Sequence, residues 1–401
     1  MSIIQGGFSL TGSASNRLIE VSTESALQIF DNVALSQRDP HARALGLYGD
    51  VSLGRNLEGR FMSFTTPKHL LSNRKNGCTW NPKGGVRMRT DTFPTCPVEY
   101  DGEQCPDVFY GTCFERLFAP GNGVRDFAGT AEGQALLAQL LRRIYLGLGN
   151  SFFDLYNFAN HPLITQANTA AFYNVSVEEW EDYMDQMMSG DCGGLITLLD
   201  ELAAQGVTNL ALDIPNADIN ETTGAFTGDI IDLFETLRET APAELKAAIE
   251  NGMVMESGVL RYPIILATNA EFNAYREYIR GLAGTNELAY RYMLEGADGT
   301  TSLMRNVLVY DNMPVVRWEA NSAFDAITGA QSHRVAIVLP TNFGVLHDVD
   351  DLMMFDGMGL VVQQSTELQN KGKVFMSTTF RWGAGIADPD FVVMASNVLH
   401  P

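Results

Sequence analysis

The sequence predicts an α+β protein built from several structural units. Three observations support this prediction: a basic, turn-rich stretch at residues 55–89, a long apolar helical pattern at 130–157, and alternating helix and strand patterns from about residue 165 that give way to a strand-rich end. A chain of 401 residues, of which 45% are hydrophobic, can fill a sizeable core. Its length favours two or three structural units.

The N-terminal stretch, residues 1 to about 45, is polar and weakly patterned, with one short apolar segment at residues 26–30. We expect an arm with a single short helix. The first residues have neither the basic region nor the apolar core of a secretory signal. No apolar run reaches the roughly 18 residues that span a bilayer. These features predict a soluble protein made in the cytosol.

Residues 55–89 form a basic island in an acidic chain. The segment contains eight basic residues and one acid, Glu58, so its net charge is +7. The whole chain has a net charge of −21, which leaves −28 for the remainder. The basic residues are Arg55, Arg60, Lys68, Arg74, Lys75, Lys83, Arg87 and Arg89. Turn-forming glycine, proline and asparagine residues interrupt the island, so we expect an extended arm or a long hairpin.

A positive arm on a negative body suggests that the arm reaches onto a neighbouring copy of the chain. Two other interpretations stay open at this point. The island could be a solvated basic loop, or it could contact nucleic acid, although the net charge of −21 argues against a general nucleic-acid binder.

The five cysteines form a cluster of four, with Cys192 apart from them. The clustered residues are Cys78, Cys96, Cys105 and Cys113. No two cysteines have the C-x-x-C spacing of a zinc site, and the odd number does not suit a secreted disulfide framework. Three alternatives stay open: free structural thiols, disulfides that form after the protein leaves a reducing cell, and a structural zinc site, which the missing spacing disfavours.

The strongest helix pattern follows residues 96–129, whose many Gly, Pro and Asp residues predict irregular connections and short strands. Thr130 is a suitable N-cap for this helix. Apolar residues then recur at three- and four-residue steps on one face: Leu137, Leu140, Leu141, Ile144, Leu148, Phe152 and Leu155. A helix to Asn157 would be about 40 Å long, although Gly147 and Gly149 lower its intrinsic propensity.

Beyond residue 165, helices and strands alternate. A capping box from Ser176 to Glu179 opens an acidic helix at 177–188. We expect further helices at 195–205, 229–240, 243–250 and 270–282, with strands at 208–214 and 261–267. Later strands are expected at 307–310, 314–318, 334–339, 360–364 and 374–382, and a final one at 390–395.

No segment has a strong catalytic or metal-binding motif. Gly121–Asp126 is interpreted as a turn, and Asn174–Ser176 as a helix N-cap. His347–Asp351 with Asp356, and Asn216–Asn220, begin like calcium loops but lack the required glycine, so we interpret both as solvated acidic turns. We therefore expect no catalytic residue, no metal ligand, no cofactor and no enzymatic activity.

The order of elements resembles that of the major capsid proteins of tailed bacteriophages, whose shell fold also builds encapsulin compartments. Three segments support this resemblance. Asn312–Val316 is similar to a strand late in the central domain, Lys373–Gly383 to the long strand near the end, and Asp388–Met394 to the closing strand.

The resemblance implies a phage major-capsid-type fold with five parts. Residues 1–45 would be the N-terminal arm and 46–118 the extended β-hairpin loop. Residues 119–160 would be the peripheral domain with its long spine helix, and 161–340 the α/β axial domain. Residues 341–401 would return as strands to the peripheral domain.

The resemblance also implies a function. The chain would self-assemble through hexamers and pentamers into the icosahedral shell around a tailed phage's double-stranded DNA, without sequence-specific DNA binding and without a membrane partner. It would be made in the host cytoplasm and reside in the virion, with portal and decoration proteins as further partners. Because the chain begins almost at the arm, we expect a separate scaffolding protein or none.

The resemblance places the basic island on the acidic surface of the next subunit, either the helix at 177–188 or the Asp348–Asp356 turn. Lys68, Lys75 and Lys83 would be placed for covalent crosslinking, and the Cys78–Cys113 cluster offers another way to lock a shell. An encapsulin-like compartment and an α/β metal-dependent enzyme with its site in residues 165–340 are the alternative functions.

Overall fold

The computed structural model describes fourteen segments of the chain, and every structural statement below refers to them. They are residues 18–22, 45–49, 51–53, 58–65, 87–104, 146–165, 168, 192–220, 222–254, 260–283, 308–329, 331–349, 358–364 and 374–397. Several expectations concern other residues and lie outside this part of the chain: the helices at 26–30, 130–145 and 177–188, Lys68, Lys75, Lys83, Cys78, Cys105, Cys113, the turn at 121–126, the N-cap at 174–176 and residues 350–356.

A mixed six-stranded sheet forms the centre of the molecule, in the order β13-β14-β12-β15-β19-β7. Its strands are β7 (Leu212–Asp213), β12 (Ile264–Ala267), β13 (Leu308–Tyr310), β14 (Met313–Arg317), β15 (Arg334–Val338) and β19 (Val392–Ser396). β12 runs parallel to β14 and antiparallel to β15. Every residue of β12, β15 and β19 is buried, as expected for strands that are covered on both faces.

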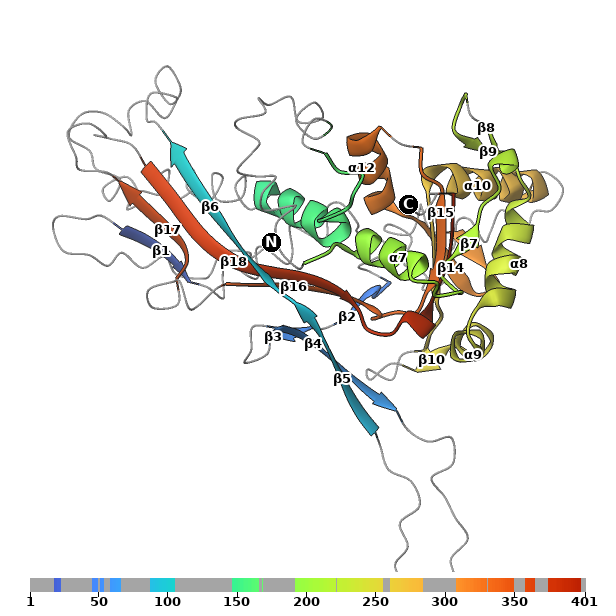
Figure 1. Ribbon diagram of the computed structural model, residues 1–401, viewed down its shortest axis with the longest axis horizontal. Coiled ribbons are helices and arrows are strands. Elements are labelled where there is room, and N and C mark those ends of the chain that lie inside the picture. Colours follow the sequence, from blue (N-terminus) through green and yellow to red (C-terminus); the bar gives the residue numbers. More distant parts are fainter. Residues whose placement is uncertain are drawn as a thin grey trace, which may run out of the picture.

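Helices cover both faces of this sheet, so the central unit has three layers (Figure 1). One face packs against a helix at 146–158, α7 (Leu195–Ala204) and α12 (Glu319–Thr328); the other packs against α8 (Ile230–Thr240), α9 (Ala243–Asn251) and α10 (Asn269–Ala283). The alternation of side chains along β12 shows this directly. Ile264 and Leu266 belong to the first core cluster, whereas Ile265 and Ala267 belong to the second.

A second six-stranded sheet extends away from these layers (Figure 1). Its strand order is β1-β17-β18-β16-β2. Strand β6 lies outside this path and pairs with β18. The strands are β1 (Leu18–Ser22), β2 (Tyr48–Gly49), β6 (Cys96–Gln104), β16 (Phe343–Val349), β17 (Met358–Gln364) and β18 (Val374–Ile386). β18 has 13 residues and pairs with three other strands, so it connects the outer part of this sheet to the core.

A two-stranded antiparallel ribbon projects from the same region (Figure 1). It consists of β4 (Glu58–Thr65) and β5 (Arg87–Pro94), paired over eight positions from Glu58↔Pro94 to Thr65↔Arg87. The short β3 (Ser52–Leu53) pairs with the start of β4. Two small hairpins complete the described strands: β8 (Ile219–Asn220) with β9 (Ala225–Phe226), and β10 (Met253–Val254) with β11 (Leu260–Arg261).

The mixed α+β class is confirmed, and so are most of the expected elements after residue 190. The helices α7 to α10 begin and end close to the expected residues. Gly206 and Gly252 follow α7 and α9 with φ angles of +85° and +68°, conformations that favour glycine at a helix end. The helix at 146–158 runs through Gly147 and Gly149, because packing of its apolar face outweighs their low propensity. None of the described helices combines the length and apolar character of a membrane span.

Several elements differ from those expected. The strand expected at 208–214 is only the two-residue strand β7. Irregular connections and short strands were expected at 96–129, but Cys96–Gln104 is one nine-residue strand, because pairing with β18 along its whole length outweighs Pro97 and Gly102. Pro97 is tolerated because β6 lies at an edge of the described sheet. Phe343–Val349 is strand β16, so the expected acidic turn does not begin at His347. Glu319–Thr328 forms the unexpected helix α12.

Candidate assembly interface

The ribbon is the candidate functional feature, because it contains three of the eight basic residues of the island. Arg60 is in β4, while Arg87 and Arg89 are in β5. The expected long hairpin is therefore confirmed for residues 58–65 and 87–94. The loop that joins the two strands, with the island's three lysines, lies outside the described residues.

One aromatic side chain, Phe93, is buried at the base of the ribbon and packs over two glycines. A Cβ atom at Gly59, its cross-strand partner, would lie 2.2 Å from the Phe93 ring. A Cβ atom at Gly383 would lie 2.8 Å from both the Phe93 ring and the backbone oxygen of Pro94. Neither position can hold a side chain without displacing the ribbon, so these glycines allow β4, β5 and β18 to approach closely.

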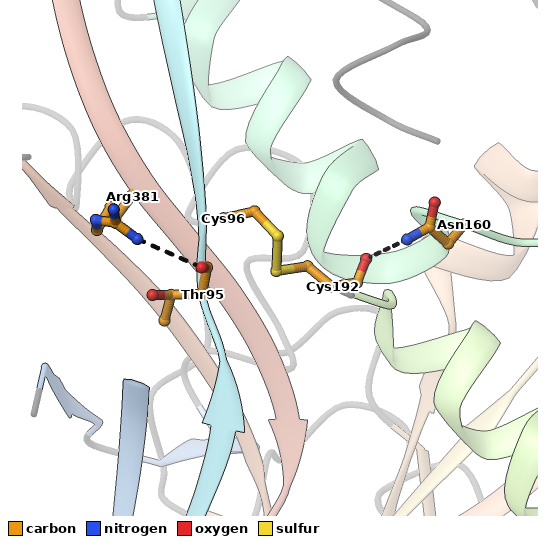
Figure 2. Close-up of a disulfide and its surroundings, with 5 residues drawn as sticks. All are labelled: Thr95, Cys96, Asn160, Cys192 and Arg381. Carbon is orange, nitrogen blue, oxygen red and sulfur yellow. Dashed lines mark hydrogen bonds between the residues drawn. A yellow bond between two sulfur atoms is a disulfide. The ribbon is translucent and has the colours of Figure 1, made fainter. Parts of the chain in front are cut away.

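Thr95 marks the point where the chain leaves the ribbon and enters the second sheet. The guanidinium of Arg381 donates a hydrogen bond to the Thr95 carbonyl oxygen over 3.4 Å (Figure 2). The next residue, Cys96, pairs with Trp382, whose side chain is fully buried. The Trp382 and Tyr156 ring centroids are 6.3 Å apart, so this junction packs directly against the helix at 146–158.

A disulfide joins Cys96 to Cys192 at this junction (Figure 2). The two Cα atoms are 6.2 Å apart, and the two residues are separated by 96 positions in the sequence. The expectation that Cys192 stands alone was therefore wrong. No local pattern indicates this pairing, because only the fold brings the start of β6 beside the residues that precede α7.

A buried polar network lies where the first helical layer meets the central sheet, and sequence reasoning did not find it. Arg334 of β15 is fully buried and donates to the carboxylate of Asp200 over 2.7 Å and to the Asn321 side-chain oxygen over 2.6 Å. Its guanidinium also stacks over the Phe324 ring, 5.0 Å from the centroid. The imidazole of His161 lies 3.1 Å from the same Asp200 oxygen. This network ties α7 and α12 to β15.

The pKa values of two carboxyl groups in the network are shifted in opposite directions. Burial by itself raises the pKa of Asp200, but hydrogen bonding to His161 and the positive charge of Arg334 outweigh it, so its pKa lies below the ordinary value. Burial raises the pKa of Asp325 to about 6, against hydrogen bonds from Ser332 and the nearby charges of Arg334 and His333. Asp200 therefore holds the negative charge that neutralises Arg334.

A second buried polar contact lies on the other side of the sheet. The His333 ring contacts the carboxylate of Glu271, and both side chains are almost completely buried. The Thr268 hydroxyl also donates to Glu271 at the start of α10. The partners in each pair are far apart in the sequence, so no local motif could have indicated them. Buried groups of this kind hold elements in register and are not exposed to a substrate.

The expected acidic turns are not assembled into a metal site in the described part of the chain. There, no group of three or more His, Cys, Asp or Glu residues is placed to hold a metal ion. Asn220 uses its side-chain oxygen to accept hydrogen bonds from the backbone of Thr222 and Thr223, both over 3.0 Å. Asn216–Asp218 is a short 3-10 helix, and Ile219–Asn220 is the first strand of a small hairpin, which agrees with a turn in place of a calcium loop.

Comparison with known proteins gives structural similarities but no sequence match. No protein-family model matches the chain, and no curated protein sequence matches it. The procapsid of satellite phage P4, which includes the size determination protein, overlaps with a TM-score of 0.46 and 8% identity, over 92% of this chain and 96% of that one. The capsid of Ralstonia phage GP4 overlaps with a TM-score of 0.40 and 12% identity, over 98% and 94%.

The holo-SrpI encapsulin complex from Synechococcus elongatus overlaps with a TM-score of 0.37 and 11% identity, over 91% of this chain and 90% of that one. These structures belong to the two classes of shell protein that the sequence resembles. At this level of overlap and identity they do not establish family membership or function. The geometry of the ribbon and of its base is therefore the stronger ground for a functional proposal.

Proposed function

We propose that the chain is the subunit of a closed protein shell that assembles from many copies of itself. The observation that supports this most directly is the β4–β5 ribbon, which leaves the packed layers and carries three basic residues of the island (Figure 1). A two-stranded hairpin is at best marginally stable in water by itself. Its outer part therefore needs a partner surface, and the acidic remainder of another copy supplies the opposite charge.

The finer proposal is that the chain is the major capsid protein of a tailed phage. It would form hexamers and pentamers, enclose double-stranded DNA and reside in the virion, with scaffolding, portal and decoration proteins as further partners. The three segments of the sequence resemblance support it, because each contributes a described strand. Asn312–Val316 leads into β14, Lys373–Gly383 lies mostly in β18, and Asp388–Met394 leads into β19.

Division into an arm, an extended loop, a peripheral domain and an axial domain belongs to the same proposal. In it, the ribbon belongs to the extended loop, and the strands and helices of the three-layer unit that lie within residues 161–340 form the axial domain. The helix at 146–158 and β19 belong to the peripheral domain. A net charge of −21 suits such a container, because a shell gains nothing from binding packaged DNA tightly. Many modest contacts, repeated by symmetry, would provide the stability of the shell.

Size-exclusion chromatography and negative-stain electron microscopy of the purified chain test this proposal. Closed particles, or rings of five and six subunits, are the expected result. The contents of particles from cells in which the chain is produced with its genomic neighbours separate the two shell functions. Double-stranded DNA supports the capsid function, and a protein cargo supports the encapsulin alternative. A monomer or small oligomer with a catalytic pocket would contradict both.

A further inference from the structure

The disulfide lies at the mechanical base of the ribbon. Cys96 is the first residue of β6, directly after Thr95, where the chain passes from the ribbon into the second sheet. Its partner, Cys192, lies three residues before the first residue of α7. The bond therefore connects the start of β6, where the ribbon ends, to the helical layer that packs on the central sheet (Figure 2).

The Cys192 side of the bond is held firmly by the core. Cys192 is only 1% exposed, and its carbonyl oxygen accepts a hydrogen bond from the Asn160 side chain over 2.9 Å. The backbone NH of Gly194 donates to the carbonyl oxygen of Ala159 over 2.9 Å. A Cβ atom at Gly194 would lie 2.3 Å from the backbone nitrogen of Phe158, so the two backbones are in direct contact.

The Cys96 side is held differently, by pairing of β6 with β18 and by contacts that include the 3.4 Å hydrogen bond from Arg381 to Thr95. β6 has the described part of the second sheet on one side only. Cys96 itself is partly exposed, whereas Cys192 is buried. A small reagent therefore reaches Cys96 first, and Cys192 can react only with a sulfur atom that is already attached to Cys96.

We propose that Cys96 and Cys192 form an oxidation site that locks the ribbon base to the core after the protein leaves a reducing compartment. In the cell both would be thiols, and the ribbon base could adjust about Thr95 during assembly. After release, the disulfide would fix that base. The purpose of the lock rests on the proposed shell function, whereas the existence of the bond and its local effect do not.

The chemistry is a two-step exchange with a low-molecular-weight disulfide such as oxidised glutathione. The Cys96 thiolate attacks the small disulfide, forms a mixed disulfide and releases one small thiol. The Cys192 thiolate then attacks the Cys96 sulfur and releases the second small thiol. Two electrons pass from the cysteine pair to the small disulfide, and the two cysteine protons end on the two released thiols.

Alkylation and mass spectrometry of the full chain give the first test. With N-ethylmaleimide and a denaturant added together at lysis, all five cysteines should be labelled; when the protein is first treated with oxidised glutathione, Cys96 and Cys192 should be protected and recovered as one cross-linked peptide. The variant Cys78→Ser/Cys105→Ser/Cys113→Ser should behave in the same way. Labelling of both residues after oxidation, or a cross-link from Cys96 to Cys78, Cys105 or Cys113, would overturn the proposal.

Hydrogen exchange of the subunit gives the second test. Oxidation of the wild type should slow amide exchange in residues 96–104 by about 30-fold, which corresponds to ~2 kcal/mol, while exchange in α9 should not change. Dithiothreitol should reverse the effect, and Cys96→Ser/Cys192→Ser should not show it. A bond that forms without slowing exchange in 96–104 contradicts the lock. Neither test requires particles, so failure of the lock and failure of the shell function are distinguishable.

Discussion

Arg334 is the residue on which the joint between the first helical layer and the central sheet depends. Its buried charge is neutralised by Asp200, and Asn321 and Ser332 accept further hydrogen bonds from it. A buried charge without a partner is strongly destabilising. The network therefore fixes how α7 and α12 sit on β15, and through α7 it positions the residues around Cys192.

The opposite pKa shifts of Asp200 and Asp325 predict a specific pH dependence of the free energy of unfolding. Because the folded pKa of Asp325, about 6, lies above the unfolded value of 3.8, its contribution is fully present below pH 3.8 and is lost as the pH rises through about 6. The pKa of Asp200 is lowered, so its contribution is lost only as the pH falls through that lower value. The two windows do not coincide.

The wild type should lose stability on the order of 3 kcal/mol between about pH 4 and pH 6.5. Asp325→Asn should not show this loss. Urea unfolding of the subunit at pH 4.5 and pH 7 measures it. The wild type should lose more free energy of unfolding than the variant over this interval. Equal pH dependence in both proteins would show that Asp325 is ionised throughout.

Two glycines offer a matched pair for testing the ribbon base. Gly383→Ala should destabilise the protein by about 1–3 kcal/mol, because the new Cβ meets the Phe93 ring and the Pro94 carbonyl oxygen at 2.8 Å. Gly147→Ala should stabilise it by about 0.5–1 kcal/mol, because the residue is exposed on a helix and nothing lies within 4 Å of the added atom.

Urea midpoints of the two glycine variants, measured side by side, provide the check. A Gly383→Ala variant that is as stable as the wild type, or more stable, would contradict the close approach of β18 to the ribbon. Limited proteolysis adds a local readout, because only Gly383→Ala should increase cleavage near Thr95.

At the scale of elements, the ribbon and the three-layer unit illustrate what the sequence could and could not indicate. Local signals located α7 to α10 well. Asp229 caps α8, glycines follow α7 and α9, and apolar residues recur at helical spacing. The basic, turn-rich stretch likewise predicted a hairpin. β6 was missed because its strand conformation depends on pairing with β18, which lies almost 300 residues further along the chain.

The disulfide and the buried network were also beyond sequence reasoning. Cys96 and Cys192, or Asp200 and Arg334, become neighbours only once the helices lie on the sheet. Helix α12 is a different case. Ala320, Phe324 and Ile327 follow a helical period and are all buried, so a signal was present. It was overlooked because the preceding strand was expected to extend through Trp318.

Charge reversal on the ribbon tests its role in assembly. Arg87→Glu/Arg89→Glu should strongly reduce particle formation, because it removes two positive charges from the element proposed to contact an acidic neighbour. The matched control is Lys246→Glu/Arg280→Glu, which makes the same change in charge on α9 and α10. Light scattering of assembly reactions measures both, and normal particles from the ribbon variant would contradict the proposed contact.

On the scale of the whole molecule, the chain combines a firm core with elements that extend far beyond it (Figure 1). Helices cover both faces of the central sheet. The buried guanidinium of Arg334 is hydrogen-bonded to Asp200 where the sheet meets α7. The second sheet and the ribbon place long strands outside these layers, connected to them through β18 and the Cys96–Cys192 junction. Such a subunit is suited to repeated contacts with copies of itself, where each extended element lies on the next copy's body.

Electron microscopy of the purified chain, at low and at physiological ionic strength, tests this account most directly. It predicts closed particles, or rings of five and six subunits, in which the ribbon of each subunit lies across a neighbouring copy. A population that contains only monomers or dimers at every protein and salt concentration would contradict it.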